Sequence, residues 1–317
     1  MTLNTPALRD TGLVVGLDIG GTKTLGVLLG PDDAVLGSVR LPTTRGVDGV
    51  VATAAKAVRA LMDDAGTGPG ALVGVGIGVP GVVDPATGTV AHAVHLGFPE
   101  GLMPLSQLLS AALDGIRVQV ENDLNVAALG AAHEVGHPAD LAFLALGTGL
   151  AAGFLLDGRL RRGAFGAAGE IGHIPFVADG PVCACGQRGC LELYASGASL
   201  DARWPGAGDV PPPAALFAAA ATGDPAAVAL RDEFARAVAA AIHILVLTTD
   251  VAYVVLGGGV SELGAPLREV VVEVLDAQAA GSAFLSSMRI GERVRLTPPG
   301  VPVAAIGAAL LGRGVVG

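Results

Sequence analysis

One short stretch of the chain, residues 169–192, reads GEIGHIPFVADGPVCACGQRGCLE and contains every cysteine of the sequence. Its three cysteines and one histidine form a metal-ligand set: His173, Cys183, Cys185 and Cys190. Three thiolates and one imidazole complete the tetrahedral coordination of Zn²⁺ and leave no open position for water. Gly186 and Gly189 allow the loop to fold back tightly on an ion. The stretch therefore predicts a structural zinc site.

Two other interpretations of the cysteine stretch are a loop without metal and a disulfide pair with a spare thiol. The clustering of every thiol beside one histidine favours the metal over the metal-free loop. Nothing in the sequence points to an oxidising compartment, which a disulfide would need. Glu170 precedes His173 by three residues, so a helical turn would place both on one face. A closed zinc site would then hold Glu170, His173 and Glu192 near one another.

The composition suits a large apolar core in an α/β fold. The chain has 317 residues, which corresponds to one large domain or two ordinary ones. Hydrophobic residues make up 51% and charged residues only 15%, whereas about 25% of residues are charged in average globular chains. The net charge of −10 argues against a general nucleic-acid binder, because such a protein would show a basic patch.

Neither a membrane span nor a secretion signal is expected from the sequence. The longest apolar candidate, residues 237–247, is interrupted by His243 and is too short to cross a bilayer. The N-terminal segment MTLNTPALRD lacks the basic-then-apolar pattern of a signal peptide. We therefore expect a soluble cytoplasmic protein that binds neither nucleic acid nor membrane.

Two apolar runs near the N-terminus flank a glycine turn. Residues 13–19 read LVVGLDI, and TKTLGVLLG follows Gly20 and Gly21, which predicts a β-hairpin. In this turn, glycine amides can approach a phosphate closely, and the hydroxyl of Thr22 can donate a hydrogen bond. Asp18 can orient a water of a magnesium ion. The turn is not a Walker loop, because the GxxxxGK[ST] spacing is missing, and a plain hairpin explains it equally well.

A second strand–turn–strand pattern follows in the middle of the chain. Residues 141–146 form an apolar run, and GTGLAAG follows at 147–153, before FLLDGRL. The Asp-Gly dipeptide of that last segment predicts a tight hairpin. Both turns contain small residues and a threonine, Thr22 in the first and Thr148 in the second. The pair suggests a duplicated fold that holds phosphate between its halves.

Polar residues stand at Glu121, Asn122 and Asp123, where a predicted strand meets a predicted helix. The strand covers residues 118–120 and runs straight into this tripeptide, and the helix is predicted over 125–134. Polar groups at such a junction are typical of a functional site in an α/β sheet. Alternatively, Asp123 is simply the N-cap of the helix.

A third glycine-rich join contains Gly258 and Gly259, between a strand predicted at 253–256 and a helix predicted from Pro266. This join would let a nucleotide base and ribose lie against the backbone. The alternative is a structural tight turn. The other predicted elements are strands at 34–41 and 72–79 and helices at 47–62, 214–221, 226–247 and 301–312.

Seven motifs together resemble the ROK family of sugar kinases and related repressors, within the actin-like, hexokinase-type ATPase superfamily. They are DIGGTK at 18–23, GVPGVVD at 78–84, END at 121–123, LGTG at 146–149, GAFGAAGEIGH at 163–173, CACGQRGCLE at 183–192 and LGGG at 256–259. The resemblance runs nearly from end to end, and the zinc stretch is its most specific part. The glucokinase branch is the most similar in character.

The resemblance implies an architecture as well as a family. It implies an α/β, two-domain, actin-like ATPase fold of the ribonuclease H-like type, with a cleft between the domains and a structural zinc loop. The smaller N-terminal domain would comprise residues 1–122 and 301–317, and the larger domain residues 123–300. The resemblance also implies a homodimer or homotetramer.

The resemblance assigns a role to each motif residue. Asp123 resembles the catalytic base that takes the proton from a sugar hydroxyl, and Asp18 resembles the acid that serves the magnesium nucleotide. Groups that resemble sugar ligands are Asn122, Asp123, Glu170, His173 and Glu192, with His173 also binding zinc. Groups that resemble the two phosphate turns and the adenosine-side turn are Gly20, Gly21, Thr22, Lys23, Gly147, Thr148, Gly149, Gly258 and Gly259.

The sequence departs from the family pattern in two places. Ala151 and Ala152 stand where many members carry glycines, and their methyl groups would narrow the nucleotide site. The segment HLGF at 95–98 stands near the sugar in the family, and Phe98 replaces a tryptophan there. The identity of the sugar is therefore left open.

The function implied by the resemblance is that of an ATP- and Mg²⁺-dependent hexose kinase of the glucokinase type, which would convert glucose to glucose 6-phosphate. Other substrates left open are fructose, N-acetylmannosamine, N-acetylglucosamine and allose, and polyphosphate is an alternative donor. The competing class is a non-catalytic, sugar-sensing regulator. Regulatory members carry a helix-turn-helix domain ahead of the kinase fold, whereas only about a dozen residues precede the first predicted strand here.

Overall fold

The hairpin predicted at residues 13–29 is present and opens a mixed five-stranded sheet. The computed structural model describes residues 12–314. The strands, in the order β3-β2-β1-β4-β7, are β3 (Val35–Pro42), β2 (Lys23–Leu29), β1 (Leu13–Ile19), β4 (Leu72–Val79) and β7 (Val118–Asn122). β1 is antiparallel to β2 and parallel to β4, and β7 is parallel to β4. The carboxyl ends of β1, β4 and β7 therefore lie at one edge of the sheet.

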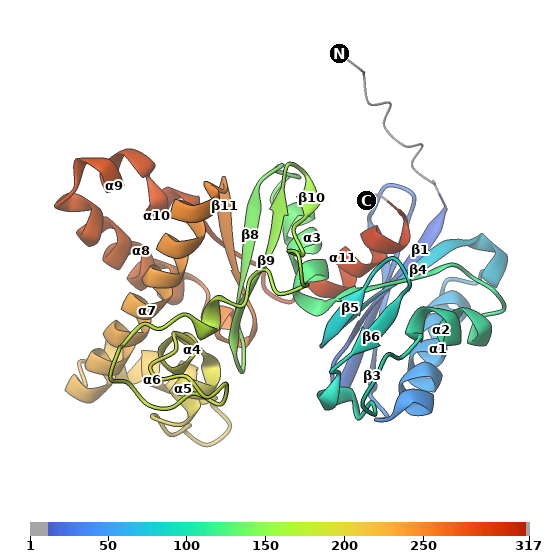
Figure 1. Cartoon of the computed structure of the whole chain (residues 1–317), viewed down its shortest axis with the longest axis horizontal. Helices are drawn as coiled ribbons and strands as arrows, with labels where there is room; N and C mark the ends of the chain where they lie inside the picture. The colour runs from blue at the N-terminus through green and yellow to red at the C-terminus, as the bar shows by residue number, and fades with distance from the viewer. Residues whose placement is uncertain (1–11, 315–317) are drawn as a thin grey trace, which may run out of the picture. The chain divides into compact units, whose positions relative to one another are not determined.

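Helices cover both faces of this first sheet (Figure 1). On one face lie α1 (Val47–Asp64) and α2 (Leu105–Ala112), and on the other lie α3 (Asp123–Glu134) and α11 (Val303–Gly312). Strand β1 supplies both cores, because Leu17 packs with the α1 side and Val14 with α11. The remaining elements here are η1 (Pro69–Ala71), β5 (Val82–Asp84), β6 (Thr89–Ala91) and η2 (Val94–Leu96).

Helix α11 approaches the sheet so closely that its backbone contacts the strands directly. A Cβ added to Gly76 of β4 would lie 1.7 Å from the carbonyl oxygen of Ala308. A Cβ added to Gly16 of β1 would lie 2.0 Å from the carbonyl oxygen of Ala305. Both strands therefore need glycine where the helix crosses them.

A second five-stranded sheet has the order β10-β9-β8-β11-β12. Its strands are β8 (Leu141–Leu146), β9 (Leu150–Leu156), β10 (Arg159–Leu160), β11 (Tyr253–Gly257) and β12 (Val294–Leu296). β8 is antiparallel to β9 and parallel to β11. The tight turn predicted before β10 is present, with Asp157 and Gly158 both at positive φ, 55° and 72°.

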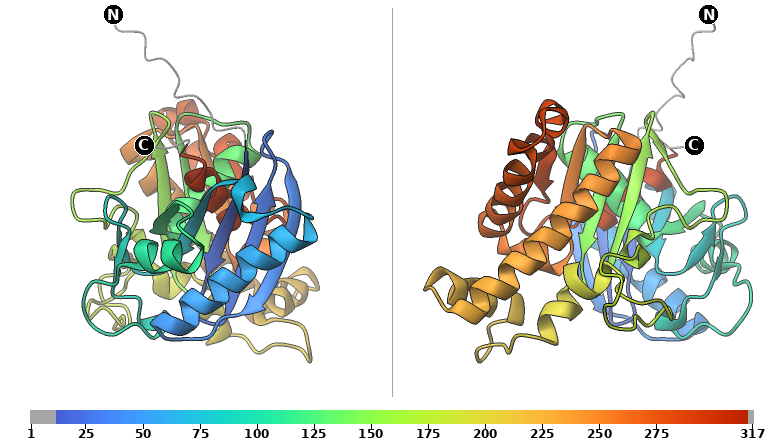
Figure 2. Two further views of the ribbon diagram at one scale, coloured as in Figure 1. Left: turned by 90° about the vertical axis from the view of Figure 1, so that its right-hand side faces the viewer. Right: turned by 60° about the vertical axis from the view of Figure 1, so that its left-hand side comes forward.

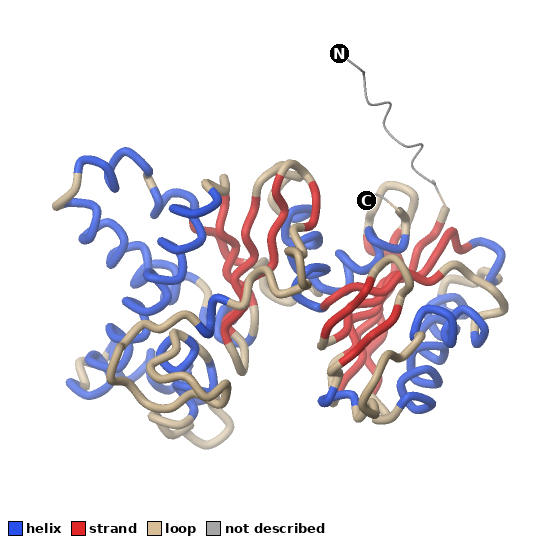
Figure 3. The backbone as a smooth tube through the Cα atoms, viewed as in Figure 1, coloured by secondary structure: helices blue, strands red, loops and turns tan. Residues whose placement is uncertain are grey.

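Helices pack on the second sheet (Figure 3). A large apolar core lies between these helices and the sheet. The helices are η3 (Ile171–His173), α4 (Glu192–Ala195), α5 (Gly197–Asp201), α6 (Pro212–Ala221), α7 (Pro225–Thr249), η4 (Gly259–Leu263), α8 (Ala265–Ala280), α9 (Ala283–Met288) and α10 (Ile290–Arg293). Figure 2 shows the long helix α7 lying along this sheet. Its half-buried His243 is a helix-face residue, as expected.

No single helix within residues 12–314 combines the length and apolar composition needed to cross a membrane. Helices α6 and α7 meet that test only when they are taken together, and they are bent by 117° at their junction.

The chain divides into two units that differ from the domains expected from the sequence. Unit 1 contains the residues up to Ala139, a short segment at 157–166 and the segment from Val301. Unit 2 contains residues 140–156 and 167–300. The expected boundary at 122–123 would separate α3 from unit 1. The structure keeps α3 there because it packs against α11, and a Cβ on Gly307 would lie 1.7 Å from the carbonyl oxygen of Val126.

The start of α3 also differs from the prediction. The helix begins at Asp123 rather than at residue 125, and its N-cap is Asn122 rather than Asp123. The side-chain oxygen of Asn122 accepts hydrogen bonds from the amides of Leu124 and Asn125, at 2.9 and 3.4 Å. Asn122 thus satisfies the exposed amides of the first turn, and Asp123 becomes the first helical residue.

Candidate active site

Two acidic side chains of unit 1 stand where strands end. Asp18 lies near the carboxyl end of β1, and Asp123 follows β7 directly. The parallel order β1-β4-β7 brings these ends to the same edge of the sheet. Asn122 fixes the junction further, because its amide group donates to the carbonyl oxygen of Gly81 at 3.2 Å. Open α/β sheets bind ligands at such an edge.

The two carboxylates interact electrostatically. Burial, and then the negative charge of Asp123, raise the pKa of Asp18 to about 6, whereas Lys23 opposes the shift. Two carboxylates that repel each other in this way favour the binding of a cation, because its positive charge would offset the repulsion between them. Oxygen ligands of this kind suit Mg²⁺.

Glu121 is a site residue to which sequence reasoning gave no role. Its side chain is buried, with 1% of the residue exposed. One carboxylate oxygen accepts hydrogen bonds from the amide of Asn122 and from Nδ2 of Asn125, both at 2.9 Å. The other accepts from Nε of Arg162 at 2.7 Å. The short spacing between Glu121, at the end of β7, and Asn125, in the first turn of α3, was a usable signal, but the contact with Arg162 was not visible in the sequence.

The first glycine turn packs against the segment that contains His95. Gly20 donates its amide to the carbonyl oxygen of Lys23 at 2.9 Å, which closes the turn. A Cβ on Gly21 would lie 2.6 Å from the backbone oxygen of His95. Thr22 and Lys23 are exposed. The turn therefore leaves the hydroxyl and the ammonium group accessible, while His95 supports the turn through its backbone.

The second and third glycine turns abut in unit 2. The carbonyl oxygen of Gly147 accepts the amide of Gly197 at 2.7 Å, and that of Thr148 accepts the amide of Ala198 at 3.4 Å. Gly258 has φ 84°, and a Cβ there would lie 2.7 Å from the carbonyl oxygen of Leu146. Gly259 begins η4 directly after it. The two turns thus form one glycine-lined surface.

The departure at Ala151 and Ala152 lies in β9, after the second turn. Ala152 is buried in the apolar core, and its amide donates to the carbonyl oxygen of Gly169 at 2.8 Å. Ala151 pairs with Ala145 of β8 and is half-buried. The methyl group of Ala152 therefore fills the core of unit 2.

The candidate sugar ligands of unit 2 lie around one short turn. The amide of His173 donates to the carbonyl oxygen of Glu170 at 3.2 Å, so the two residues lie one 3₁₀ turn apart. Glu170 is exposed and His173 is half-buried. Glu192 begins α4, and its Oε2 accepts the amide of Leu150 at 3.1 Å.

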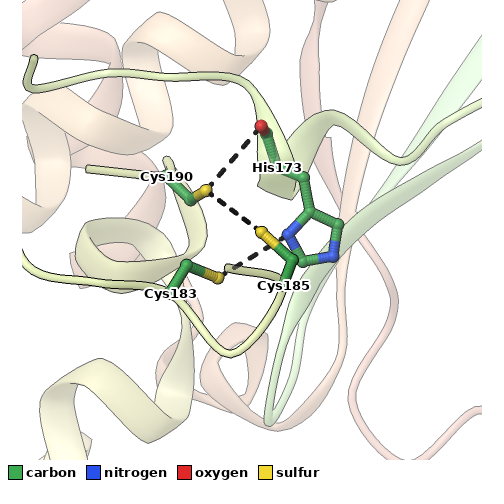
Figure 4. A group of neighbouring side chains, drawn as sticks. All are labelled: His173, Cys183, Cys185 and Cys190. Atoms are coloured by element: carbon green, nitrogen blue, oxygen red, sulfur yellow. Dashed lines mark hydrogen bonds between the residues drawn. The ribbon is translucent and has the colours of Figure 1, made fainter. Parts of the chain in front are cut away.

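The cysteine stretch folds into a cluster (Figure 4). The ligand atoms of His173, Cys183, Cys185 and Cys190 all lie within 4.8 Å of one another. The sulfurs of Cys185 and Cys190 are 3.6 Å apart, and the sulfur of Cys183 is 3.8 Å from Nδ1 of His173. Tetrahedral ligands at zinc bond lengths are about 3.5–3.8 Å apart. The cluster therefore fits zinc, and it leaves Nε2 of His173 outside the ligand set.

Two thiols of the cluster, those of Cys185 and Cys190, differ in acidity. A backbone hydrogen bond from Gln187 lowers the pKa of Cys185 to about 6, whereas burial raises the pKa of Cys190 to about 12. A zinc ligand must be deprotonated, so metal binding would release the proton of Cys190. The loop itself depends on Gly186 and Gly189, which have positive φ values of 90° and 64°.

The model of the ROK family matches residues 14–313. The chain belongs to the ROK family. It is 34% identical over 274 residues to the glucokinase of Streptomyces coelicolor, with 80% of this chain and 84% of that protein covered. It is 31% identical over 248 residues to the N-acetylmannosamine kinase of Vibrio cholerae, with 78% and 83% covered. The family predicted from the motifs is thus confirmed.

A solved ROK structure has the same fold over almost the whole chain. The ROK family glucokinase from Streptomyces griseus, solved in complex with glucose and AMPPNP, is 31% identical to this chain, with a TM-score of 0.77. The match covers 96% of this chain and 100% of that one. The expected α/β fold is confirmed, and together with the curated relatives this likeness supports a sugar kinase.

Proposed function

We propose that this ROK protein transfers the terminal phosphoryl group of ATP to a hydroxyl of a hexose, with glucose as the first candidate. The observation that carries the proposal is the acidic pair at the strand ends of unit 1, Asp18 and Asp123. Such a pair supplies both groups that the reaction needs: a base that accepts the hydroxyl proton, and a second carboxylate that serves the magnesium ion of the nucleotide.

Asp123 is the proposed general base. It stands at the first position of α3, and its Oδ1 accepts the amide of Leu124 at 2.9 Å, which fixes the side chain. A positioned base of this kind contributes roughly 10²- to 10⁴-fold to the rate. The proton of the attacking hydroxyl passes to the carboxylate as the oxygen attacks the terminal phosphorus, and the bond from that phosphorus to the bridging oxygen breaks and releases ADP. The rest of the catalysis is positioning, because phosphoryl transfer requires little covalent chemistry from the protein.

Asp18 is proposed to serve the magnesium ion of the nucleotide. The bound ion would neutralise charge on the phosphates, and it would favour the ionised form of Asp18. The exposed Thr22 and Lys23 are placed on the turn that follows β1, where a hydroxyl and an ammonium group suit a phosphate. Gly258 and Gly259 are proposed to contact the adenosine side.

Unit 2 is proposed to hold the sugar. Glu170 and Glu192 offer carboxylates that accept hydrogen bonds from hydroxyl groups, and Nε2 of His173 is the ring nitrogen that remains when Nδ1 binds zinc. Zinc would thereby orient a sugar ligand as well as the loop. A site lined with such polar groups rejects analogues that lack a hydroxyl, because its own groups would be left unpaired.

The choice of sugar is the open part of the proposal. Glucose is favoured by the relative from Streptomyces coelicolor, which is a glucokinase, and N-acetylmannosamine by the relative from Vibrio cholerae. The test is ADP release from magnesium ATP against glucose, mannose, fructose, allose and both N-acetylhexosamines. We expect turnover on one sugar, with glucose the first candidate.

Asp123→Asn is the matched control for this assay. We expect the variant to bind sugar and to lose turnover by at least about 10²-fold, because the amide cannot accept the proton. Wild-type protein that holds zinc but turns over no sugar, with either ATP or polyphosphate as donor, would contradict the kinase and point to a sugar sensor.

A further inference from the structure

Glu192 contacts the second glycine turn directly. Its Oε2 accepts the amide of Leu150 at 3.1 Å, the residue that follows Gly147, Thr148 and Gly149. A Cβ added to Gly149 would lie 2.5 Å from the same oxygen. The carboxylate therefore lies against the turn proposed to hold phosphate, and glycine at position 149 makes room for it.

The zinc stretch holds Glu192 in this place from the other side. The half-buried Glu192 begins α4 two positions after the buried zinc-ligand candidate Cys190. The amide of Leu191 donates to the carbonyl oxygen of Ile174 at 2.9 Å. A Cβ on Gly172 would lie 2.1 Å from the carbonyl oxygen of Leu150 and 3.3 Å from Cβ of Glu192. Three segments are thus closely packed around Glu192: the 171–173 turn, the start of α4 and the turn at 147–149.

We propose that Glu192 is a positioning residue that couples the sugar ligands to the phosphate turn, an inference that rests on the proposed function. One carboxylate oxygen holds the amide of Leu150, and the other accepts a sugar hydroxyl. A carboxylate has enough lone pairs for both contacts. Bound sugar then fixes Glu192, and Glu192 fixes the turn that receives the nucleotide.

This arrangement makes the two ligands bind cooperatively. A sugar that orders Glu192 reduces the cost of ordering the turn when the nucleotide binds, and the effect is reciprocal by linkage. We expect sugar to tighten nucleotide binding by about fivefold or more. The hydrogen bond from Leu150 joins two groups of the protein itself, so Glu192 is also expected to matter for nucleotide binding when no sugar is present.

The test measures affinity for a non-hydrolysable ATP analogue with magnesium and without sugar, by calorimetry on the full chain. Glu192→Ala is expected to weaken binding about fivefold or more, and Glu192→Gln to restore most of it, because the amide oxygen still accepts from Leu150. Glu170→Ala is the control, because it removes the other candidate sugar carboxylate, which is exposed. It should leave this affinity unchanged while weakening sugar binding.

A reciprocal test uses the turn itself. Gly149→Ala is expected to push the Glu192 carboxylate aside and weaken sugar binding about fivefold or more without nucleotide. Gly147→Ala is the matched control in the same turn, because a Cβ there meets no atom within 4 Å. Zinc content and melting temperature of each variant verify the fold.

The outcomes separate the coupling from the function. Unchanged nucleotide affinity in Glu192→Ala, or equal sugar affinity in Gly149→Ala and Gly147→Ala, overturns the coupling and leaves the kinase intact. Wild-type protein that binds no nucleotide overturns the proposed function, and the coupling with it.

Discussion

At the scale of single residues, Glu121 is a buried carboxylate whose environment depends on one partner side chain. It is a carboxylate buried beside the proposed catalytic base, and its charge is balanced by Arg162. A buried ion pair contributes little net stability, but removing one partner leaves an uncompensated buried charge. Glu121 therefore positions the junction around Asp123 only as long as Arg162 is present.

Arg162→Met is expected to lower the free energy of unfolding by about 3 kcal/mol, because Glu121 stays buried without its partner. Adding Glu121→Gln should recover part of the loss. Urea titration of the single and double variants measures this. Arg203→Met is the control, because the pair of Arg203 and Glu233 is largely exposed and should cost less than about 1 kcal/mol. Equal losses in the Arg162 and Arg203 variants would count against this role.

Asp18 predicts a dependence of stability on pH. Its folded pKa of about 6 lies above the ordinary value of 3.8, so the folded state holds the proton more tightly. The contribution of Asp18 to the unfolding free energy is full below pH 4 and decreases as the pH rises to about 6. Asp18→Asn removes this decrease and should gain up to about 3 kcal/mol over the parent protein above pH 6. Urea titrations of the parent protein and of Asp18→Asn at pH 4, 5, 6 and 7 without magnesium test this prediction. The same dependence of the unfolding free energy on pH in both proteins would refute it.

At the scale of elements, the interface between α11 and the first sheet is formed by direct backbone contacts. Gly76→Ala is expected to lower the free energy of unfolding by about 1–3 kcal/mol, because its Cβ would overlap the carbonyl oxygen of Ala308. Gly37→Ala, in β3 of the same sheet, is the control, because its nearest neighbour would be 3.8 Å away. Thermal unfolding of both variants measures the difference. If Gly37→Ala lost as much stability as Gly76→Ala, the role of the close backbone contact between α11 and β4 would be contradicted.

The cysteine loop is expected to hold one zinc ion per chain. Cys185→Ser should abolish the metal content, because only three ligands remain, whereas His243→Gln, outside the cluster, should leave it unchanged. Elemental analysis of the purified proteins measures the zinc. A Cys185→Ser protein with full zinc content would show that the cluster is not the metal site.

At the scale of the whole molecule, the chain leaves unit 1 after Ala139, returns to it for the short segment 157–166 and returns again at its end. Residues from Val301 onward belong to unit 1, although more than half of the sequence separates them from β1. Arg313 joins this segment to Asp33 at 2.9 Å and to the carbonyl oxygen of Gly12 at 2.7 Å, and the guanidinium is buried. Unit 1 therefore cannot complete its core before the last helix is made.

Truncation after Gly300 is accordingly expected to leave unit 1 unfolded, because β1, β2 and β4 would lose the helix that covers one face. The soluble fraction and circular dichroism of the truncated chain measure this. Arg313→Met is the milder comparison, which keeps the helix but removes its buried charge. A truncated chain that melts at the wild-type temperature would contradict the dependence.

The sequence by itself determined the features that depend on local spacing. The candidate zinc ligands, the glycine turns and the hairpin at 13–29 each lie within a short stretch of the chain, and the geometry of metal coordination and of tight turns is a local requirement. The family followed from the same motifs. The capping of α3 by Asn122 was also local, but Asn and Asp are near-equivalent N-caps, so propensity did not separate them.

Only the tertiary structure decided which distant groups meet. The bond between Glu192 and Leu150 joins residues 42 positions apart, and that between Glu121 and Arg162 spans 41. Both depend on strand pairing and loop packing, which no local pattern specifies. The placement of α3 in unit 1 has the same origin, because it depends on backbone contact with a helix from the far end of the chain.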